Sequence, residues 1–405
     1  MNSDVPVLPP DWNYEELGDL IEPGGISYGI VQPGQRDQSG VPIVRVNNVR
    51  DGRITTQDVL RVSAEVEASY SRTRLRGDEV LLSLVGSVGE VAVVPPEMAG
   101  WNVARAIAVI RPSEHVSSYW LKHWLRSPFA RRLMHMWQTT TVQATLNLRD
   151  VRRLPVAMPP QLERCAITEA LSTLDCKIES NVSTRRSLRA LGCALFDEAL
   201  AQSPAEAAIG DLAESLARGV APRYTDPGVG VLVLNQKCIR DGWASTDAAR
   251  WMEDVSVPDS KTARRGDIVV NSTGVGTLGR VARWVSSEPV AVDGHVTVVR
   301  FSGTYPRVVA GYGMLAAQPQ IQSLGEGSTG QTELSRARLA ELRIEIPTPG
   351  EARRIAEILE TVDDHAEALV SESRKLVALR DTLLPPLISG ELRVRDVEAL
   401  VGEAV

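Results

Sequence analysis

The sequence predicts an α+β protein with two similar mixed α/β domains, separated by two long antiparallel coiled-coil helices and related by a pseudo-twofold axis. Three observations lead to this prediction. The sequence repeats itself at an offset of about 189 residues, and such repeats decide the fold before local patterns do. Each copy contains short Val- and Ile-rich runs typical of strands. Each copy is followed by a long run whose apolar residues recur at coiled-coil spacing.

The repeat consists of short matching segments in the same order. The matched pairs are Arg76-Gly77-Asp78 with Arg265-Gly266-Asp267, Gly86/Gly89 with Gly276/Gly279, Thr141-Val142-Gln143 with Thr329-Gly330-Gln331, Leu146 with Leu334, and Met158-Pro159 with Ile346-Pro347. Two copies of a unit this large indicate two related domains rather than a solenoid of many small repeats.

Within each copy, the order of predicted elements is also the same. Leu17–Leu20 opens the first copy and Ile209–Leu212 opens the second. The predicted strands are 43–46, 80–85, 91–94 and 106–110 in the first copy, and 229–234, 267–271 and 296–301 in the second. Residues 118–137 show helical spacing of Leu121, Trp124, Leu125 and Leu133, which predicts one helix.

Two long helices are predicted, over about 160–198 and about 350–384. The positions of their predicted seams correspond along the chain, and all but Asn181 are apolar. They are Ile167, Leu171, Leu174, Ile178, Asn181, Leu188, Leu191 and Leu195 in the first helix, and Ile355, Leu359, Val362, Ala366, Leu369, Leu376, Leu379 and Leu383 in the second. At 1.5 Å per residue these helices would be rods of about 50–60 Å. An apolar stripe needs a partner, so we expect the helices to pair antiparallel, with Asn181 as a polar group in the seam or at a frayed, solvated point.

These patterns divide the chain into five segments. The first domain is predicted over 1–158 and the second over 204–346. The spacer helices occupy 159–203 and 347–386, and 387–405 is a C-terminal tail.

Composition narrows the class of protein. The chain has 405 residues, of which 43% are hydrophobic, and its net charge is −7. No apolar run approaches the roughly 18–20 residues of a membrane span, and no signal peptide is visible at the N-terminus. The four cysteines form no C-x-x-C pair, which favours a reduced, cytoplasmic protein without a metal site.

The acidic total argues against an independent, high-affinity nucleic-acid binder, but local charge differs from the total. Residues 120–153 contain seven basic residues and one acid, Asp150. The basic residues are Lys122, Arg126, Arg131, Arg132, Arg149, Arg152 and Arg153. Such a run is a solvated helix face or a contact surface for phosphate or a partner.

Catalytic motifs are weak. Gly274-Val275-Gly276-Thr277-Leu278-Gly279 matches G-x-G-x-x-G, but no helical pattern follows it, as the dinucleotide fingerprint requires. A pair of turn glycines in a β-hairpin explains both copies better. The sequence has no P-loop, no G-x-S-x-G elbow and no methyltransferase motif. The domain is duplicated, but no set of catalytic residues is duplicated with it. This combination indicates a recognition protein, which is not an enzyme by itself.

The chain resembles the specificity subunits of type I restriction-modification systems over nearly its whole length. The resemblance rests on the duplicated segments, on residues 102–112, on the helix starts at 159–163 and 347–351, and on the C-terminal segment 383–392. The chain departs from the family at Arg164 and Ala352, where Gln is common after the helix-opening Glu. Arg105 also lacks a clear counterpart near Asp293-Gly294-His295. These departures concern the docking of subunits.

The resemblance implies that each domain is a target-recognition domain for one half of a bipartite double-stranded DNA site, with the helices as spacer. It also implies two methyltransferase subunits as partners and, where the system has them, restriction/translocase subunits. Cofactors are expected on those partners (S-adenosylmethionine, ATP and Mg), with none in this chain. The complex would methylate adenine and act as a type I restriction endonuclease.

Candidate DNA-contacting residues are polar or basic and lie near strand ends and glycine turns. They are Arg45, Asn47, Asn48, Arg50, Gln143 and Thr145 in the first domain, and Asn235, Gln236, Lys237, Ser328, Thr329 and Gln331 in the second. Arg, Asn and Gln suit bidentate contacts with guanine or adenine, and the alternative role for each residue is a turn or a cap. Arg131, Arg132, Arg149, Arg152 and Arg153 would contact phosphate or a partner.

Two other classes of function stay open at this point. One is a stand-alone enzyme with a nucleotide site at 274–279, which cofactor binding by the isolated chain would reveal. The other is a coiled-coil scaffold for protein partners that never contacts DNA.

Overall fold

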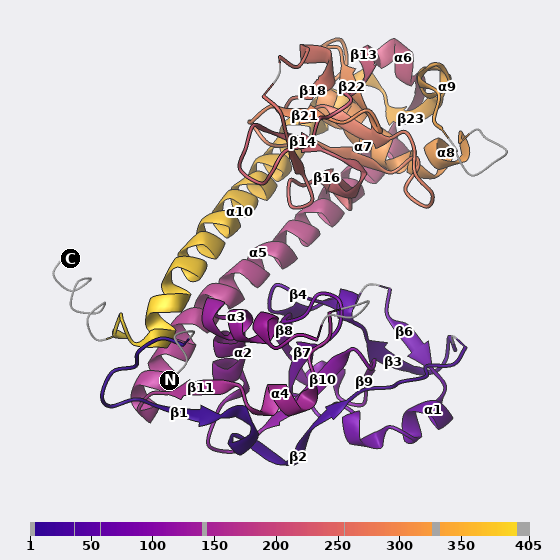
Figure 1. The fold of residues 1–405 in the computed structure, drawn as a ribbon. Coiled ribbons are helices and arrows are strands. Elements are labelled where there is room, and N and C mark those ends of the chain that lie inside the picture. Colours follow the sequence, from indigo (N-terminus) through magenta and orange to yellow (C-terminus); the bar gives the residue numbers. More distant parts are fainter. Residues whose placement is uncertain are drawn as a thin grey trace. The chain divides into compact units, whose positions relative to one another are not determined.

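The structure is a computed structural model that describes residues 5–35, 37–56, 58–139, 144–254, 256–325 and 333–394. The chain divides into two compact units. Unit 1 comprises Met1–Ile178 and Lys375–Val405, and unit 2 comprises Glu179–Arg374. Both contain β-sheets and short helices, and Figure 1 colours the elements in chain order.

Unit 1 is built on two small sheets. The larger has the antiparallel strand order β2-β10-β7-β8, and the smaller has the order β6-β3-β9 with β3 and β9 parallel. These strands are β2 (Ile21–Tyr28), β3 (Val41–Val44), β6 (Leu60–Val62), β7 (Val80–Ser83), β8 (Val91–Val93), β9 (Asn102–Val103) and β10 (Ile107–Pro112). Two ribbons, β1 (Asn13–Glu16) with β11 (Pro155–Met158) and β4 (Val49–Arg50) with β5 (Arg53–Ile54), complete the strands described in this unit. Its short helices are α1 (Ala64–Ala68), α2 (Ser118–Arg126), α3 (Pro128–Met136) and α4 (Leu148–Arg152).

Unit 2 repeats this plan. Its larger sheet has the order β13-β22-β19-β20-β16-β15, whose first four strands correspond to β2-β10-β7-β8, and its second sheet has the order β17-β14-β21-β18. The strands are β13 (Ala213–Arg218), β14 (Val231–Leu234), β15 (Ile239–Arg240), β16 (Gly242–Ala244), β17 (Arg250–Met252), β18 (Thr262–Ala263), β19 (Ile268–Asn271), β20 (Val281–Arg283), β21 (Val290–Val292) and β22 (Val296–Phe301). The helices are α6 (Ile209–Leu212), α7 (Arg307–Ala316), α8 (Gln318–Ser323) and α9 (Arg336–Glu341). The shared strand order confirms the duplication that the sequence predicts.

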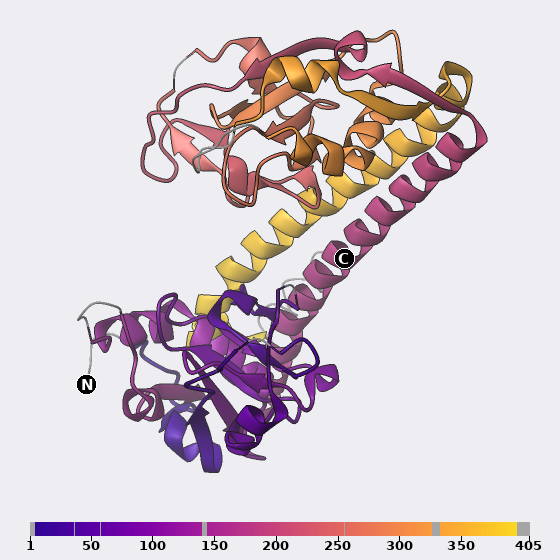
Figure 2. The same cartoon turned by 90° about the vertical axis from the view of Figure 1, so that its right-hand side faces the viewer.

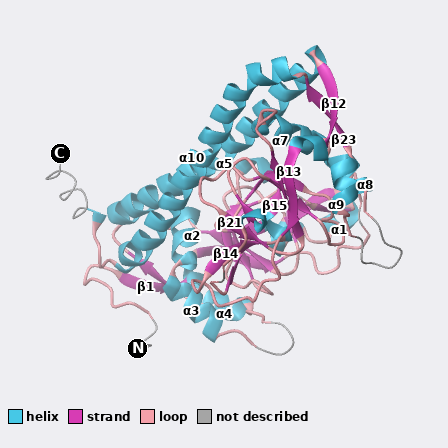
Figure 3. Cartoon of the chain, turned by 90° about the horizontal axis from the view of Figure 1, so that it is seen from above, coloured by secondary structure: helices cyan, strands magenta, loops and turns pink. Residues whose placement is uncertain are grey.

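The long helices are α5 (Gln161–Gln202) and α10 (Pro349–Ser389). In unit 2, the ribbon of β12 (Pro204–Ala208) and β23 (Arg343–Pro347) joins the end of α5 to the start of α10 (Figure 3). α10 continues past the predicted end near Leu384, through Pro385 and Pro386. Leu387 and Ile388 are buried in the core of unit 1. The free energy gained by burying these side chains offsets the cost of the helix hydrogen bonds that the two prolines cannot make.

Within unit 2, α5 and α10 lie side by side and antiparallel (Figure 2). Asn181 is buried, and its Nδ2 donates to Glu372 Oε2 at 2.8 Å and to Ser373 Oγ at 3.3 Å. Further along α5, Leu188 packs against Val362 and Ala366, which precede Ser373 in α10. The structure therefore confirms the antiparallel pairing and the polar position in the seam.

Two predicted seam positions are wrong. Leu191 and Leu379 are 49% and 47% exposed, whereas the next residues, Gly192 and Arg380, are buried. Gly192 leaves room for Tyr312, because an added Cβ would lie 2.1 Å from the Tyr312 hydroxyl oxygen. In both helices a specific contact displaces the leucine that the regular spacing favours.

An acid with little exposed surface, half-buried Asp175 in α5 and buried Asp363 in α10, occupies the same place in both helices. In unit 1, Asp175 of α5 contacts Lys122 at 2.7 Å, Arg126 at 3.5 Å and Arg380 at 2.9 Å. In unit 2, Asp363 of α10 accepts from Arg283 Nη1 at 2.8 Å. Each acid thus ties its helix to the globular part of its own unit, although the cations come from different elements.

The predicted single helix over 118–137 is wrong. It divides at Ser127 into α2 and α3. Pro128 restricts the preceding residue to extended backbone, and Ser127 adopts it with φ −62° and ψ 153°. The Ser127 hydroxyl accepts a hydrogen bond from the Ala130 amide and so caps α3.

Candidate nucleic-acid interface

The candidate residues of both units lie mainly in one equivalent turn. This turn covers Val46–Asn48 in unit 1 and Gln236–Cys238 in unit 2. It follows β3 in unit 1 and β14 in unit 2. The amide of Asn48 donates to the Arg45 carbonyl at 2.8 Å, and the amide of Cys238 donates to the Asn235 carbonyl at 2.9 Å. These matching bonds make Asn47 and Lys237 equivalent, and both side chains are exposed.

In unit 1, the other candidates of this turn have local partners. Asn48 is buried, and its Oδ1 accepts from the Arg45 amide at 3.0 Å, which is a capping role. Arg45 Nη2 donates to the Asp58 carbonyl at 2.5 Å. Arg50 is exposed and lies 3.5 Å from the Asp51 carboxylate. Asn47 and Arg50 are therefore the candidates of this turn that present the most side chain to solvent.

In unit 2, Asn235 also caps the turn. Its Oδ1 accepts from the Lys237 amide at 2.8 Å, and its Nδ2 donates to the Ala248 carbonyl at 2.6 Å. Gln236 is half-buried, and its Nε2 donates to the carbonyl and the hydroxyl of Thr273 at 2.7 and 2.6 Å. The turn thus holds one exposed cation, Lys237, beside a side-chain network that sequence reasoning did not identify.

The second group of candidates lies in or beside the matched segments Thr141-Val142-Gln143 and Thr329-Gly330-Gln331. Thr145 is half-buried and pairs as an isolated bridge with Val85 and Thr139. The equivalent residue in unit 2 is Glu333, which bridges Thr273. Gln143, Ser328, Thr329 and Gln331 lie outside the described residues, so their predicted roles stay predictions.

The basic run of residues 120–153 has two parts. Lys122 and Arg126 are buried and bind Asp175, so their predicted place on a solvated face is wrong. Arg132, Arg149 and Arg153 are exposed and can contact phosphate or a partner. All residues of α2 except Tyr119 are buried, so no apolar spacing along this helix could have identified the division.

The glycine-rich segment 274–279 is a hairpin turn. Gly274, Gly276 and Gly279 all have positive φ, and the turn joins the antiparallel strands β19 and β20. Gly86 and Gly89 have the same conformation between β7 and β8. Because a strand follows instead of a helix, no helix N-terminus is present to bind a pyrophosphate. The hairpin interpretation is confirmed, and the alternative of a nucleotide site at this segment is wrong.

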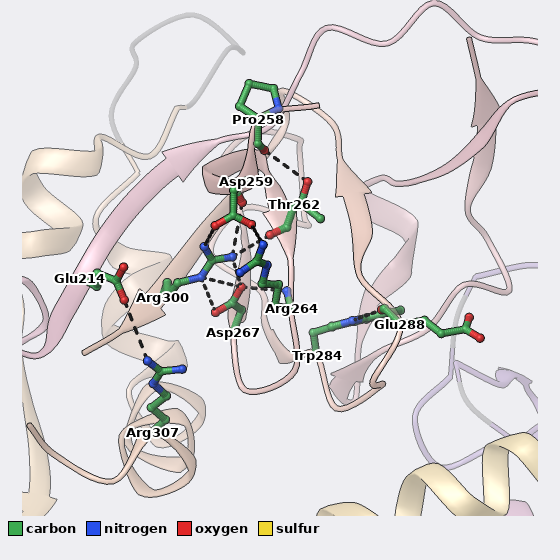
Figure 4. Close-up of polar contacts among 10 residues, drawn as sticks. All are labelled: Glu214, Pro258, Asp259, Thr262, Arg264, Asp267, Trp284, Glu288, Arg300 and Arg307. Carbon is green, nitrogen blue, oxygen red and sulfur yellow. Dashed lines mark hydrogen bonds and ion pairs between the residues drawn. The ribbon is translucent and has the colours of Figure 1, made fainter. Parts of the chain in front are cut away.

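The two Arg-Gly-Asp segments match in sequence, but the structurally equivalent residues differ from that match by one position. The counterpart of Asp267 is Glu79, not Asp78, because each accepts amide hydrogen bonds from its own preceding turn. Glu79 lies 3.6 Å from Arg111, and Asp267 lies 2.8 Å from Arg300. Figure 4 shows Arg300 between Asp267 and Asp259, with Thr262 beside it. This network is satisfied internally and is a structural element of the unit.

The described part of the chain offers neither a metal centre nor a membrane span. In the segments that the structure describes, His, Cys, Asp and Glu side chains form no group of three or more that could hold a metal ion. None of the described helices combines the length and the apolar character that a membrane span needs.

Comparisons with known proteins agree on one family. Residues 259–377 match the family model described as type I restriction modification DNA specificity domain. The Escherichia coli type I restriction enzyme EcoBI specificity subunit is 28% identical over 170 residues, which span 42% of this chain and 36% of that protein. The putative type I restriction enzyme MjaX specificity subunit of Methanocaldococcus jannaschii is 21% identical across 97% of this chain and 96% of its own length.

A solved structure shows the same fold. The crystal structure of a type I restriction-modification system S subunit from M. genitalium matches with a TM-score of 0.54 and 14% identity. The match covers 96% of this chain and 99% of that one.

Proposed function

We infer that the chain is a DNA-specificity subunit of the type I restriction-modification family, in which each unit reads one half of a bipartite double-stranded DNA target. The observation that carries this proposal is the pairing of one duplicated fold with different side chains at the same exposed turn, Asn47 in unit 1 and Lys237 in unit 2. Two units with the same fold but different contact residues are suited to binding two half-sites of different sequence.

The physical chemistry of DNA recognition supports separate roles for the residues that contact bases and those that contact phosphate. Direct readout in the major groove needs polar side chains on rigid turns, and phosphate contacts from Lys and Arg set position and affinity. With a net charge of −7, the chain alone would bind DNA weakly, since phosphate neutralisation provides much of the affinity. Partner subunits would therefore supply part of the basic surface.

We assign catalysis to those partners. They are two methyltransferase subunits that use S-adenosylmethionine and, in systems that restrict, translocase-nuclease subunits that use ATP and Mg. α5 and α10 act as the spacer between the two readers and, with the adjoining surfaces, as the docking surface for the methyltransferase subunits.

Co-expression with the methyltransferase subunits of its own system, followed by genome-wide mapping of methylated adenine, tests the proposal. The expected result is a split motif whose two parts are separated by a fixed number of unspecified base pairs. A methyltransferase expressed without this chain is the control and should methylate no such motif. A continuous motif, or no methylation by a complex that assembles, would overturn the proposal. Assembly without DNA binding would favour a protein scaffold instead.

A further inference from the structure

Three polar side chains form a connected chain in unit 2. Gln236 lies after β14, Thr273 follows β19, and His295 precedes β22. Gln236 Nε2 lies 2.6 Å from Thr273 Oγ1, which lies 2.8 Å from His295 Nδ1. Gln236 and Thr273 are half-buried, whereas His295 is exposed at the end of the chain of hydrogen bonds.

The fold does not need this chain of polar residues, as unit 1 demonstrates. The amide of Ser272 donates to the His295 carbonyl at 2.8 Å, and the amide of Leu84 donates to the Ala106 carbonyl at the same distance. The shared backbone bonds and strand pairings therefore give the equivalent residues in unit 1, which are Val46, Val85 and Ala106. All three are apolar. The shared fold therefore does not require this network, which leaves it available for a function specific to unit 2.

The hydrogen bonds also have a direction. An amide nitrogen can only donate, and both contacts of Gln236 Nε2 are to acceptor oxygens of Thr273. The hydroxyl of Thr273 can then donate its own proton to His295 Nδ1. In this arrangement the neutral imidazole carries its proton at Nε2 and presents an N–H donor to solvent.

The surroundings suit approach by DNA. The glycine turn at 274–276 packs over the network, since a Cβ on Gly274 would lie 3.0 Å from Gln236 Nε2. Lys237, on the same turn as Gln236, and Arg240, on the strand β15 that follows, are exposed and can contact phosphate. Cations that can contact phosphate therefore lie beside a polar side chain that can contact a base edge, and a base-reading site needs both kinds of contact.

We propose that His295 reads a purine in the half-site bound by unit 2, with Thr273 and Gln236 as positioning residues. The Nε2–H group donates to the N7 or O6 acceptor that a purine presents in the major groove. Thr273 and Gln236 fix the tautomer and the ring orientation without contacting the base. This inference rests on the proposed function and extends it to named residues.

The test uses the assembled methyltransferase complex and maps methylated adenine for each variant. His295→Ala and Thr273→Val should relax the motif at one base pair in one half, with roughly tenfold less discrimination against the other bases there. Thr273→Ser keeps the hydroxyl and should retain the wild-type motif. The triple variant Gln236→Val/Thr273→Val/His295→Ala installs the apolar residues of unit 1, so it should fold and show the same relaxation.

The outcomes separate this inference from the proposed function. If the wild-type complex methylates a split motif but His295→Ala leaves that motif unchanged, His295 is not a reader. Relaxation in both halves, or a uniform loss of methylation with an unchanged motif, would also overturn the assignment. If the wild-type complex methylates no split motif, the proposed function itself fails.

Discussion

Arg300 Nη2 lies 2.8 Å from Asp267 Oδ2, and the two residues occupy in unit 2 the place that Arg111 and Glu79 occupy in unit 1. In each unit the acid also accepts an amide hydrogen bond from the turn before it. The ion pair therefore fixes that turn to the neighbouring strand of the larger sheet. Its presence in both copies, with a different acid in each, marks it as part of the shared scaffold.

Asp267→Asn should lower the free energy of unfolding by about 1.5–3 kcal/mol, because it removes the buried carboxylate that pairs with Arg300 and leaves Asp259 as the carboxylate partner. Urea unfolding of the full chain measures the change. Glu206→Gln is the matched control, since Glu206 pairs with Arg343 on the surface and such pairs contribute about 0–1 kcal/mol. Equal effects of the two substitutions would show that the Asp267 pair is not a scaffold element.

The sequence predicts the duplication, the order of several strands along the chain and the pairing of the long helices, because these depend on periodic apolar patterns and turn residues. It does not predict which acid binds a buried arginine. The letters align Asp78 with Asp267, but the longer side chain of Glu79 makes the equivalent contact. The reader candidates show the same limit. Burial separates Asn47 from Asn48, and the link from Gln236 to His295 joins residues far apart in sequence.

Asp363→Asn should destabilise the chain by about 3–5 kcal/mol, whereas Asp364→Asn should change stability by about 0–1 kcal/mol. Asp363 is buried against Arg283, and burial raises its carboxyl pKa while Arg283 opposes that rise. Its neighbour Asp364 is exposed and pairs with Arg265 on the surface. Chemical unfolding of the two variants under the same conditions makes the comparison. A larger loss for Asp364→Asn would contradict the anchoring role of Asp363.

His123 should make the chain lose stability on mild acidification. Burial, and then the charge of Lys122, lowers the pKa of His123 from 6.5 to about 3. Between those values the unfolded chain binds a proton that the folded chain does not. Stability therefore falls as the pH drops below about 6.5, by roughly 1.4 kcal/mol per pH unit, until about pH 3.

His123→Gln removes this titration and can still reach the Ser172 hydroxyl, which lies 3.2 Å from His123 Nε2. Between pH 7 and pH 4, the unfolding free energy of this variant should fall by about 3 kcal/mol less than that of the wild type. Denaturant titrations across this range measure the difference. His365→Gln, which replaces an exposed histidine, is the control for the substitution itself. Parallel pH profiles for wild type and His123→Gln would refute the buried, neutral histidine.

Asn47 and Asn48 are adjacent, but their substitution should have opposite consequences. Asn48 is buried and caps the turn, as Cys238 Sγ does for the Asn235 amide in unit 2. Asn48→Ala should therefore cost about 1–3 kcal/mol of stability and leave the methylated motif unchanged. Asn47 is exposed, so Asn47→Ala should change stability by about 0.5 kcal/mol or less and relax the motif at one base pair.

Thermal melting of the chain and adenine mapping of the assembled complex measure the two properties separately. The base pair relaxed by Asn47→Ala should lie in the half of the motif that His295→Ala leaves intact, since the residues belong to different units. A motif relaxed by Asn48→Ala at full stability would exchange the roles of the two asparagines. Relaxation by Asn47→Ala and His295→Ala in the same half would contradict the assignment of one half-site to each unit.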